Sequence, residues 1–451
     1  MSSKRLLICS PSHALRGGVE SIINDLCREI GGRGWEPLLG LGKGSRFNDV
    51  AAYRSAYADL PIVEIDGTKG TRQGRLEALE SVIKRVQPDV VMSARIFDAY
   101  DVVTSLKQRQ GSPRLAVTIR GFEPNYLFDA RVYKDNIDLC VVDGKLLAAA
   151  CVGWCGLNES RVVSIPGGIR PSKSAIEPRQ SLPIMRIGYV GRLSQSDKRV
   201  LDLVPLVRSL DEQALGFHLR IVGEGPEELA LREQLERFVL DARVTFHRWK
   251  THEQLYGDVY PNLDCIVNFS PAEGVTISGR EAMAHGVVPV MSRFVGMQSE
   301  GFYVHELNAL TFPVGDITTA TMNIIRLKNE PGLLNRLSKR AAASQTGRYT
   351  YEGAIEAWAE AFDRCLEQPP ALGPMPRLAL PPDGRLARIG LSPRIAQMTR
   401  DFLGRRHVHD DPGSEWPTGS GLIDQQTADE IMQFATNYES KANKSNGKVV
   451  S

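Results

Sequence analysis

Short apolar runs alternate with longer helical patterns along most of this chain, and this alternation constrains the fold more than any other feature. In the helical patterns Ser21–Ile30 and Leu76–Val86, apolar residues recur three and four positions apart, as in helices with one buried face. The first set of apolar runs comprises Leu6–Ser10, Pro37–Leu41, Asp89–Ser93, Leu115–Ile119 and Leu139–Asp143. Strands and helices that alternate at this spacing indicate a parallel sheet covered by helices on both faces.

The same alternation restarts at Arg186, so a second sheet is predicted. The helical pattern Glu227–Leu240 lies among its apolar runs, which are Arg186–Gly191, Leu219–Val222, Val244–His247, Cys265–Ser270 and Val287–Ser292. Because the Gly- and Pro-containing stretch Pro166–Lys173 and a polar segment separate the two sets, we predict an α/β fold with two doubly wound Rossmann-like domains. Their expected bounds are 1–165 and 185–350, joined by a linker at 166–184.

The last part of the chain follows a different pattern. Tyr351–Leu366 fits a helix with one apolar face, and we expect it to occupy residues 351–368. Prolines from Pro369 onward end regular structure, so residues 369–451 are predicted to be a partly disordered C-terminal appendage. Within it, Arg385–Arg406 is basic and amphipathic, although Pro393 interrupts it. Two interpretations stay open: this stretch docks on an anionic membrane, or it covers the protein's own surface.

Composition narrows the class of protein. No apolar run approaches the roughly 20 residues of a membrane-spanning helix. The 55 basic and 53 acidic residues leave a net charge of +2, which argues neither for nor against nucleic acid, and we expect no nucleic-acid partner. The seven scattered cysteines are typical of a reducing compartment, so we expect a cytoplasmic protein. Cys151 and Cys155 have a spacing that some metal sites use, but no second pair lies near them, which favours helix packing.

The segment Ser270–Gly286 carries the strongest chemical signal. An apolar strand ends at its start, a glycine-containing loop follows, and a helix is expected to begin near Gly279. Backbone N–H groups and a helix N-terminus that converge in this way suit a phosphate. Seven residues separate Glu273 on the loop from Glu281 in the first helical turn, so one carboxylate can hold a sugar and the other a ribose. For Glu281 alone, simple stabilisation of the helix start is an equal alternative.

A second motif, Gly188–Leu193, lies where the first strand of the second domain ends, and ligands of open α/β sheets bind at such ends. There Arg192 and Lys198 can oppose a leaving diphosphate with two positive charges, in place of a divalent metal. Taken alone, both side chains are explained as well by solvation on a loop. In the first domain, Gly17 and Gly18 open a helix and leave room for a ligand, although many ordinary loops carry such a pair.

Together these residues resemble the retaining glycosyltransferases of the GT-B fold, known as glycosyltransferase group 1 or family 4. The resemblance covers roughly residues 1–365. It is carried, in the family's order, by Gly17-Gly18-Val19-Glu20, Pro88-Asp89-Val90-Val91, Ile165–Ile169, Gly191-Arg192-Leu193 with Lys198, the Glu273–Glu281 segment and Asn308–Pro313. Several motifs in one order are hard to obtain by chance.

The resemblance implies two domains that face a central cleft, with the acceptor on the N-terminal side, the nucleotide-sugar donor on the C-terminal side, and residues 351–368 crossing back to the first domain. It implies sugar transfer from a nucleoside-diphosphate sugar with retention of anomeric configuration, and with neither a metal nor another cofactor. The implied catalytic residues are Arg192, Lys198 and Glu273. The implied donor-binding residues are Gly17, Gly18, Arg120, Gly274, Val275, Thr276, Ile277 and Glu281. A glycan or lipid-linked acceptor, and peripheral contact with the inner face of the membrane, complete the expectation.

Two positions depart from the family pattern. Arg120 stands where the family commonly has a histidine, so any role that needs a neutral imidazole is lost, although hydrogen bonds to sugar hydroxyls stay available. Arg280 stands where the family usually has an aliphatic residue. Beside an active transferase, the alternatives are a GT-B pseudoenzyme that acts as a binding or assembly subunit, a nucleotide-sugar epimerase and a phosphorylase. A phosphorylase needs a lysine-bound pyridoxal phosphate, and nothing in the sequence marks such a site.

Overall fold

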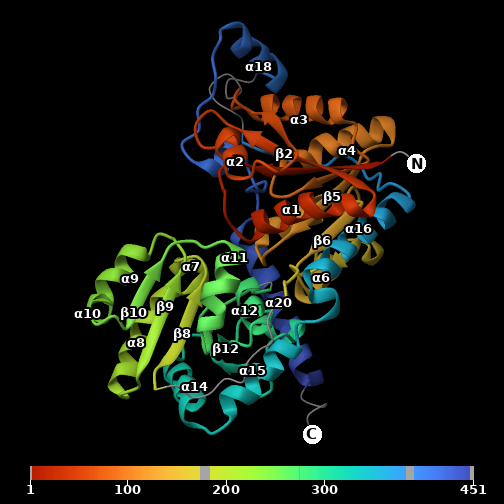
Figure 1. Ribbon diagram of the computed structural model, residues 1–451. Coiled ribbons are helices and arrows are strands. Elements are labelled where there is room, and N and C mark those ends of the chain that lie inside the picture. The colour runs from red at the N-terminus through yellow and green to blue at the C-terminus, as the bar shows by residue number, and fades with distance from the viewer. Residues whose placement is uncertain (1–2, 173–182, 274, 382–390, 447–451) are drawn as a thin grey trace. The chain divides into compact units, whose positions relative to one another are not determined.

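The computed structural model describes residues 3–172, 183–273, 275–381 and 391–446, and the chain forms two compact units (Figure 1). The first unit comprises Met1–Pro166 and Ala354–Phe434. The second comprises Gly167–Gly353 and Ala435–Ser451. Each unit therefore combines one long continuous stretch with a segment that returns from the C-terminal part of the chain.

The first unit is built on a seven-stranded sheet of order β3-β2-β1-β4-β5-β6-β7. Each strand pairs in parallel with its neighbours, as the alternation of patterns predicted. The strands are β1 Lys4–Pro11, β2 Trp35–Lys43, β3 Ile62–Asp66, β4 Val90–Ser93, β5 Arg114–Ile119, β6 Leu139–Val142 and β7 Val162–Ser164. The sequence pattern missed β3 and β7, which form the two edges of the sheet.

Helices connect these strands, and polar residues fix where several of them begin. The Thr71 side chain accepts the N–H of Gly74 at 3.1 Å and so caps α3, while Asp49 caps α2 in the same way. The helices of the long stretch are α1 Gly18–Glu29, α2 Val50–Ala56, α3 Arg72–Val86, α4 Asp98–Gln110, α5 Pro124–Val132 and α6 Lys145–Gly153. The returning segment contributes most of α16 Tyr351–Glu367, and then α18 Pro393–Phe402 and α19 Pro412–Glu415.

The C-terminal segment of the first unit belongs to its core, so the expectation of an appendage was wrong for these residues. Trp416 is fully buried, and its indole Nε1 donates to the Lys43 carbonyl at 3.1 Å. Beside it, the Glu415 carboxylate accepts the backbone N–H groups of residues 45–48 at 2.6–2.9 Å. An indole and a carboxylate with such partners hold the segment against the sheet. Residues 382–390, where the basic stretch was predicted to begin, lie outside the described residues.

The second unit is built on a six-stranded parallel sheet of order β10-β9-β8-β11-β12-β13. The strands are β8 Met185–Val190, β9 Phe217–Val222, β10 Val244–His247, β11 Cys265–Asn268, β12 Val288–Ser292 and β13 Leu310–Phe312. The longer helices are α8 Leu203–Glu212, α9 Glu228–Gln234, α10 Glu236–Leu240, α12 Ile277–Ala284, α14 Ile317–Asn329 and α15 Leu333–Ala343. The short ones are α7 Gln195–Lys198, α11 His252–Gln254 and α13 Met297–Glu300, and α20 Gln425–Asn446 begins in the first unit and ends in the second. The predicted helix Glu227–Leu240 is two helices, because Leu235 leaves the helical conformation (φ −106°, ψ 7°).

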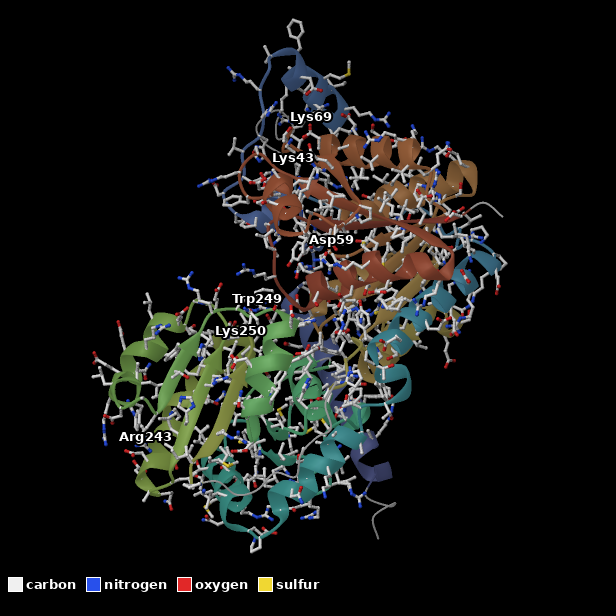
Figure 2. The ribbon with its side chains drawn as sticks, viewed as in Figure 1. Lys43, Asp59, Lys69, Arg243, Trp249 and Lys250 are labelled. Carbon is white, nitrogen blue, oxygen red and sulfur yellow. The ribbon has the colours of Figure 1, made fainter. Side chains whose placement is uncertain are left out.

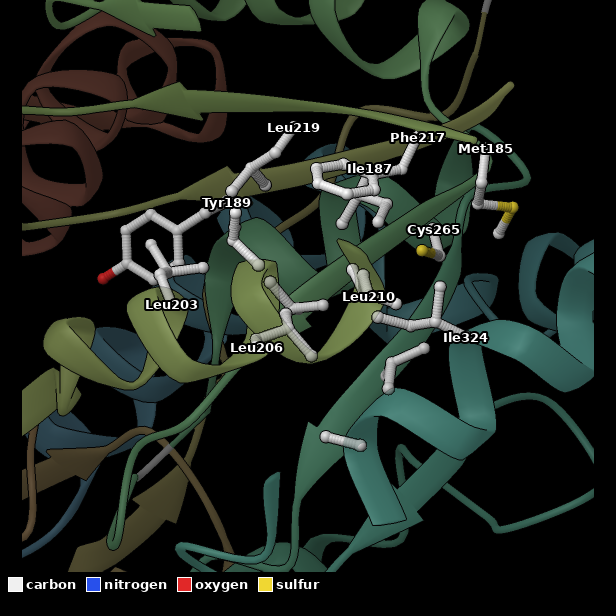
Figure 3. Close-up of a cluster of buried hydrophobic side chains, with 14 of the residues drawn as sticks. Met185, Ile187, Tyr189, Leu203, Leu206, Leu210, Phe217, Leu219, Cys265 and Ile324 are labelled. Carbon is white, nitrogen blue, oxygen red and sulfur yellow. The ribbon is translucent and has the colours of Figure 1, made fainter. Parts of the chain in front are cut away.

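The core of the second unit includes the side chains on one face of β8, which pack on α8. Ile187 and Tyr189 are two positions apart, so both project from the same face of the strand. They pack above Leu203 and Leu206 of α8 (Figure 3), and all four side chains are buried. Across the described parts of both units, no helix combines the length and the apolar character that spanning a bilayer demands.

Candidate functional site

The candidate site of the second unit lies where two central strands of its sheet end. β8 and β11 are neighbours, while β9 pairs with β8 and β12 pairs with β11, so the connections after β8 and β11 lead to opposite sides of the sheet. Ligands of open α/β sheets bind at such a switch point. Lys198 follows β8 and Glu273 follows β11, and both predicted catalytic residues therefore lie at this edge.

Lys198 and Glu273 form an ion pair. The Lys198 Nζ lies 2.6 Å from Glu273 Oε1, and Ser270 Oγ donates to the same oxygen at 2.6 Å. The two charged side chains are only 23% and 12% exposed, so water screens the pair weakly. Burial, and to a smaller extent the Glu273 charge, raises the pKa of the nearby Tyr189 above its usual range. The site thus holds an ammonium group in a fixed position at the carboxyl ends of the strands.

Arg192 lies on the same loop as Lys198 but has a different environment. Its side chain is 69% exposed, and its Nη2 lies 3.8 Å from the Asp197 carboxylate. Its backbone carbonyl accepts the hydroxyl of Tyr189 at 2.7 Å. The backbone at Arg192 is therefore fixed, while the guanidinium lies in solvent next to the site.

The N-terminal end of α12 follows β11 and matches the predicted position for a phosphate. The helix begins at Ile277, two residues before the predicted start near Gly279, and buried Val275 and Thr276 lead into it. The N–H groups of a first helical turn have no acceptor within their own helix, so they are available to an anion. Gly274, which the sequence also placed in the site, lies outside the described residues.

Glu281 is the fifth residue of α12 and lies beyond its first turn, so stabilisation of the helix start does not explain it. Its side chain is buried, and two tyrosines hold its carboxylate. Tyr256 donates its hydroxyl to Oε1 at 2.8 Å, and Tyr260 donates to Oε2 at 2.7 Å. His252 Nε2 lies 3.6 Å from Oε1. Burial and the Glu281 charge raise the pKa of Tyr260 well above its usual value, so its hydroxyl stays protonated and donates.

Sequence reasoning missed the aromatic residues around Glu281. The His252 and Tyr256 rings stack at 5.6 Å, and the His285 ring lies 4.8 Å from Tyr256 and 5.5 Å from Tyr260. The sequence does contain a pattern that could have found them. His252, Tyr256 and Tyr260 are spaced by four, so they share one face of a helical segment. Part of that segment is the π-helical turn Leu255–Val259, a type of turn that often occurs at functional sites.

Arg280 has a structural role in the second unit, which accounts for its departure from the family pattern. Its side chain is fully buried below the ring of Phe302, 4.6 Å away. Nη1 donates to the Gly167 carbonyl at 2.7 Å, Nη2 donates to the Tyr349 carbonyl at 3.1 Å, and Nε donates to Gln345 at 3.2 Å. Gly167 opens the long stretch of this unit, and Tyr349 lies near its end. Arg280 therefore joins the two ends of that stretch.

In the first unit, Gly17 caps α1 and Gly18 begins it, and both are exposed after β1. The same helix carries the buried Glu20, which forms an ion pair with Arg95 on the loop after β4. The backbone of Arg95 is left-handed (φ 69°), a conformation that costs non-glycine residues about 1–2 kcal/mol. Because β1 and β4 are the central neighbours in this sheet, these residues also lie at a switch point.

Arg120 was predicted to bind the donor, but its side chain is engaged within the first unit. The side chain is 4% exposed and lies 5.0 Å from the Trp358 ring of α16. Its Nη1 donates to Asp143 at 2.5 Å and to the Ile165 carbonyl at 2.7 Å, and its Nε donates to Thr118 at 2.9 Å. With these partners the guanidinium holds the end of β5 to the segment after β7, a structural role in place of the predicted contact with the sugar.

All seven cysteines are buried free thiols, as the sequence predicted. Cys140 and Cys151 Sγ lie 3.8 Å apart, and Cys155 Sγ donates to the Leu127 carbonyl at 3.3 Å. Burial raises the pKa of Cys9 and Cys27 to about 12. These thiols fill the core. In the described ranges, no three His, Cys, Asp or Glu side chains come together in a way that fits a metal ion.

Comparison with known proteins matches this site to a family. Residues 185–330, which contain β8, β11, α12 and the Lys198–Glu273 pair, match the model of the glycosyl transferases group 1 family. The lipopolysaccharide core biosynthesis glycosyltransferase LpsD of Rhizobium meliloti is 24% identical over 290 residues, which cover 63% of this chain and 78% of LpsD.

Solved structures show the same fold. Anabaena HepE in complex with UDP and glucose superposes with a TM-score of 0.64 at 18% identity, covering 80% of this chain and 99% of HepE. Sucrose-phosphate synthase of Thermosynechococcus elongatus gives 0.65 at 17% identity over 81% of this chain and 99% of its own. The lipopolysaccharide outer core galactosyltransferase WaaB gives 0.62 at 15% identity, again over 80% and 99%. The chain is thus a glycosyltransferase of the GT-B fold, and its residues 185–330 form a domain of the glycosyl transferases group 1 family.

Proposed function

We propose that this glycosyltransferase moves a sugar from a nucleoside-diphosphate sugar to a glycan or lipid-linked acceptor in the assembly of a lipopolysaccharide or a related polysaccharide, with retention of anomeric configuration. The shielded Lys198–Glu273 pair carries the proposal, because it holds a cation and a sugar-binding carboxylate at the switch point of the second sheet. The likeness to LpsD, named for lipopolysaccharide core biosynthesis, and to HepE, solved with UDP-glucose, supports it. Uridine-diphosphate sugars are therefore the first donors to test.

Lys198 is proposed to stabilise the leaving diphosphate. In the reaction the bond from the anomeric carbon to the diphosphate oxygen breaks, and the acceptor oxygen bonds to the same carbon and loses its proton. Negative charge grows on the leaving oxygen, and a preorganised ammonium group stabilises this charge more in the transition state than in the ground state. Arg192 supplies a second positive charge from the same loop, and the two cations take the place of a divalent metal.

The remaining contacts of the donor are assigned to the loop after β11 and to α12. Glu273 is proposed to accept hydroxyl groups of the sugar, and the N–H groups of Val275, Thr276 and Ile277 to bind phosphate. Glu281 is proposed to accept the ribose hydroxyls. A carboxylate has about four lone-pair sites, so it retains acceptor capacity while it holds the two tyrosine hydroxyls.

The test is a panel of nucleotide sugars, with uridine-, guanosine- and adenosine-diphosphate donors, supplied to the purified protein with and without candidate acceptors. Release of the nucleoside diphosphate identifies the donor, and proton NMR of the fresh product gives its anomeric configuration. Turnover that survives a chelator supports the two-cation assignment, whereas loss that manganese restores contradicts it. If the folded protein binds nucleotide but turns over no donor, a role as a binding subunit would replace the proposed transferase activity.

A further inference from the structure

The helix α18 packs on the first unit through its polar residues. Its Gln397 is buried and hydrogen-bonds Thr71 at the start of α3. Its Asp401 forms an ion pair with Lys69 at 2.9 Å, and Lys69 lies beside α18 in Figure 2. Within α18, all of which the structure describes, the small Ala396 is the one apolar residue that is buried. A surface helix normally turns its apolar face to the protein, so α18 is oriented the other way round.

The outer face of α18 is apolar and exposed. Ile395, Met398 and Phe402 are separated by three and four positions, so they form one stripe on the side opposite Gln397. Met398 is 71% and Phe402 90% exposed. Leu403 and Val408, which follow in the chain, are also exposed. A cluster of five large exposed apolar side chains on one short segment marks a surface that binds a partner.

Positive charge accompanies this apolar stripe. Residues 391–408 carry four arginines and a single acidic residue, Asp401, whose carboxylate is already paired with Lys69. Arg394 precedes the stripe in the chain, Arg405 and Arg406 follow it, and all three are exposed. An apolar stripe flanked by arginines matches the interface of an anionic bilayer, where apolar side chains enter the acyl boundary and cations meet lipid phosphates.

The stripe is also held in a fixed place on the first unit. The residues after α18 return to the unit, where the N–H of His407 donates to the Lys69 carbonyl at 3.1 Å. Eight and nine residues further on, Glu415 and Trp416 fasten the chain in the core. Because contacts from α18 itself and from the residues after it fasten the segment to the first unit, its exposed face is presented without a further ordering cost.

From this geometry we propose that the outer face of α18 docks the protein on an anionic lipid surface. The sequence left open whether this segment covers the protein or binds a membrane, and the orientation of α18 favours the membrane. Pro393, which the sequence suggested interrupts the stretch, is the first residue of α18 and begins it. The docking surface is separate from the candidate site of the second unit, so its failure and the failure of the proposed transferase activity can be distinguished.

The experiment measures binding of the full-length protein to vesicles by co-sedimentation. Vesicles of phosphatidylcholine with phosphatidylglycerol are compared with vesicles of phosphatidylcholine alone. The wild type is expected to bind only the anionic vesicles. Phe402→Ser and Met398→Ser should each weaken binding about tenfold, because each removes an apolar side chain that enters the bilayer. Arg405→Gln and Arg406→Gln should each weaken it about fivefold, and added salt should do the same.

Matched controls use the exposed leucines of the second unit. Leu229 on α9 and Leu240 on α10 are 75% and 80% exposed, like the residues of the stripe, but they belong to the other unit. Leu229→Ser and Leu240→Ser should leave vesicle binding unchanged. All six variants replace exposed side chains, so their thermal unfolding should match the wild type.

Three results would overturn the proposal. If the wild type binds both kinds of vesicle equally, the arginines do not recognise anionic lipid. If Phe402→Ser binds the vesicles as well as the leucine controls do, the apolar stripe is not the docking surface. A wild type that ignores vesicles but self-associates in solution, and becomes monomeric on Phe402→Ser, would assign the face to a second copy of the chain.

Discussion

Lys198 and Glu273, 75 residues apart in the chain, meet in an ion pair of 2.6 Å at the carboxyl edge of the second sheet. Lys198→Ala should therefore lower turnover by about 100-fold or more, since it removes the charge that opposes the leaving diphosphate. Glu273→Gln should reduce turnover of the donor while affinity for free nucleoside diphosphate changes little. Steady-state kinetics and calorimetry with the free nucleotide measure the two effects. Arg199→Gln serves as the control, because Arg199 is the next residue and pairs with Asp202 at 2.9 Å.

The tyrosines that hold Glu281 give a second prediction. Tyr256→Phe and Tyr260→Phe each remove a hydroxyl that fixes the carboxylate, so nucleotide affinity should fall about tenfold for each change. Glu281→Gln should weaken nucleotide binding further, with a smaller effect on turnover at saturating donor. Titration calorimetry with the nucleoside diphosphate measures these affinities. Unchanged affinity in all three variants would limit this cluster to the packing of the second unit.

A third prediction concerns stability and uses the buried Arg280. Arg280→Leu, which restores the aliphatic residue of the family, leaves the carbonyls of Gly167 and Tyr349 without their donor. The free energy of unfolding should fall by about 2–4 kcal/mol, since a buried unsatisfied acceptor costs about 1–3 kcal/mol. Arg280→Lys should lie between, because an ammonium group cannot reproduce the planar fork. Denaturant unfolding measures all three proteins, and equal midpoints would refute the structural role.

The pH dependence of stability provides a fourth prediction. Asp129 is buried and accepts the N–H of Ser420 at 2.9 Å, and burial raises its pKa to about 6. A carboxyl whose folded pKa is above its unfolded value favours folding at low pH. That contribution is complete below about pH 4 and is lost as the pH rises through about 6, up to roughly 3 kcal/mol. Asp129→Asn should therefore match the wild type near pH 4 and be more stable near pH 8. Thermal unfolding across this range tests it, and a pH-independent difference between the proteins would contradict it.

The sequence predicted the central strands of both sheets well, and the strands that it missed are informative. β3, β7 and β13 are all edge strands, and β7 and β13 are only three residues long. Central parallel strands are buried on both faces and produce continuous apolar runs. β3 and β7 are partly exposed, so they lack the continuous apolar run that the pattern detects, and the three residues of β13 are too few to form one.

Some residues of the candidate site could likewise be predicted from the sequence, and others could not. Local spacing pointed to Lys198 and Glu273, which follow the ends of central strands, and to Glu281, which lies in the helix after β11. The spacing by four places Tyr256 and Tyr260 on one face of a helical segment, but it could not show that their hydroxyls hold Glu281. Nor could it show that Arg120 bonds to backbone far along the chain. Long side chains select partners by tertiary structure, so their roles are the least predictable from spacing.

The burial of Trp416 under the first sheet has a consequence for synthesis on the ribosome. A Cβ added to Gly42 or Gly67 would lie 2.6 Å from its ring, so the two glycines leave the slot that the indole fills. The slot is translated near the start of the chain, but its occupant emerges some 350 residues later. At a translation rate of about 5–20 residues per second, the nascent first unit waits tens of seconds with an apolar face uncovered. Packing around Gly42 and Gly67 is therefore completed only after Trp416, far along the chain, has been synthesised.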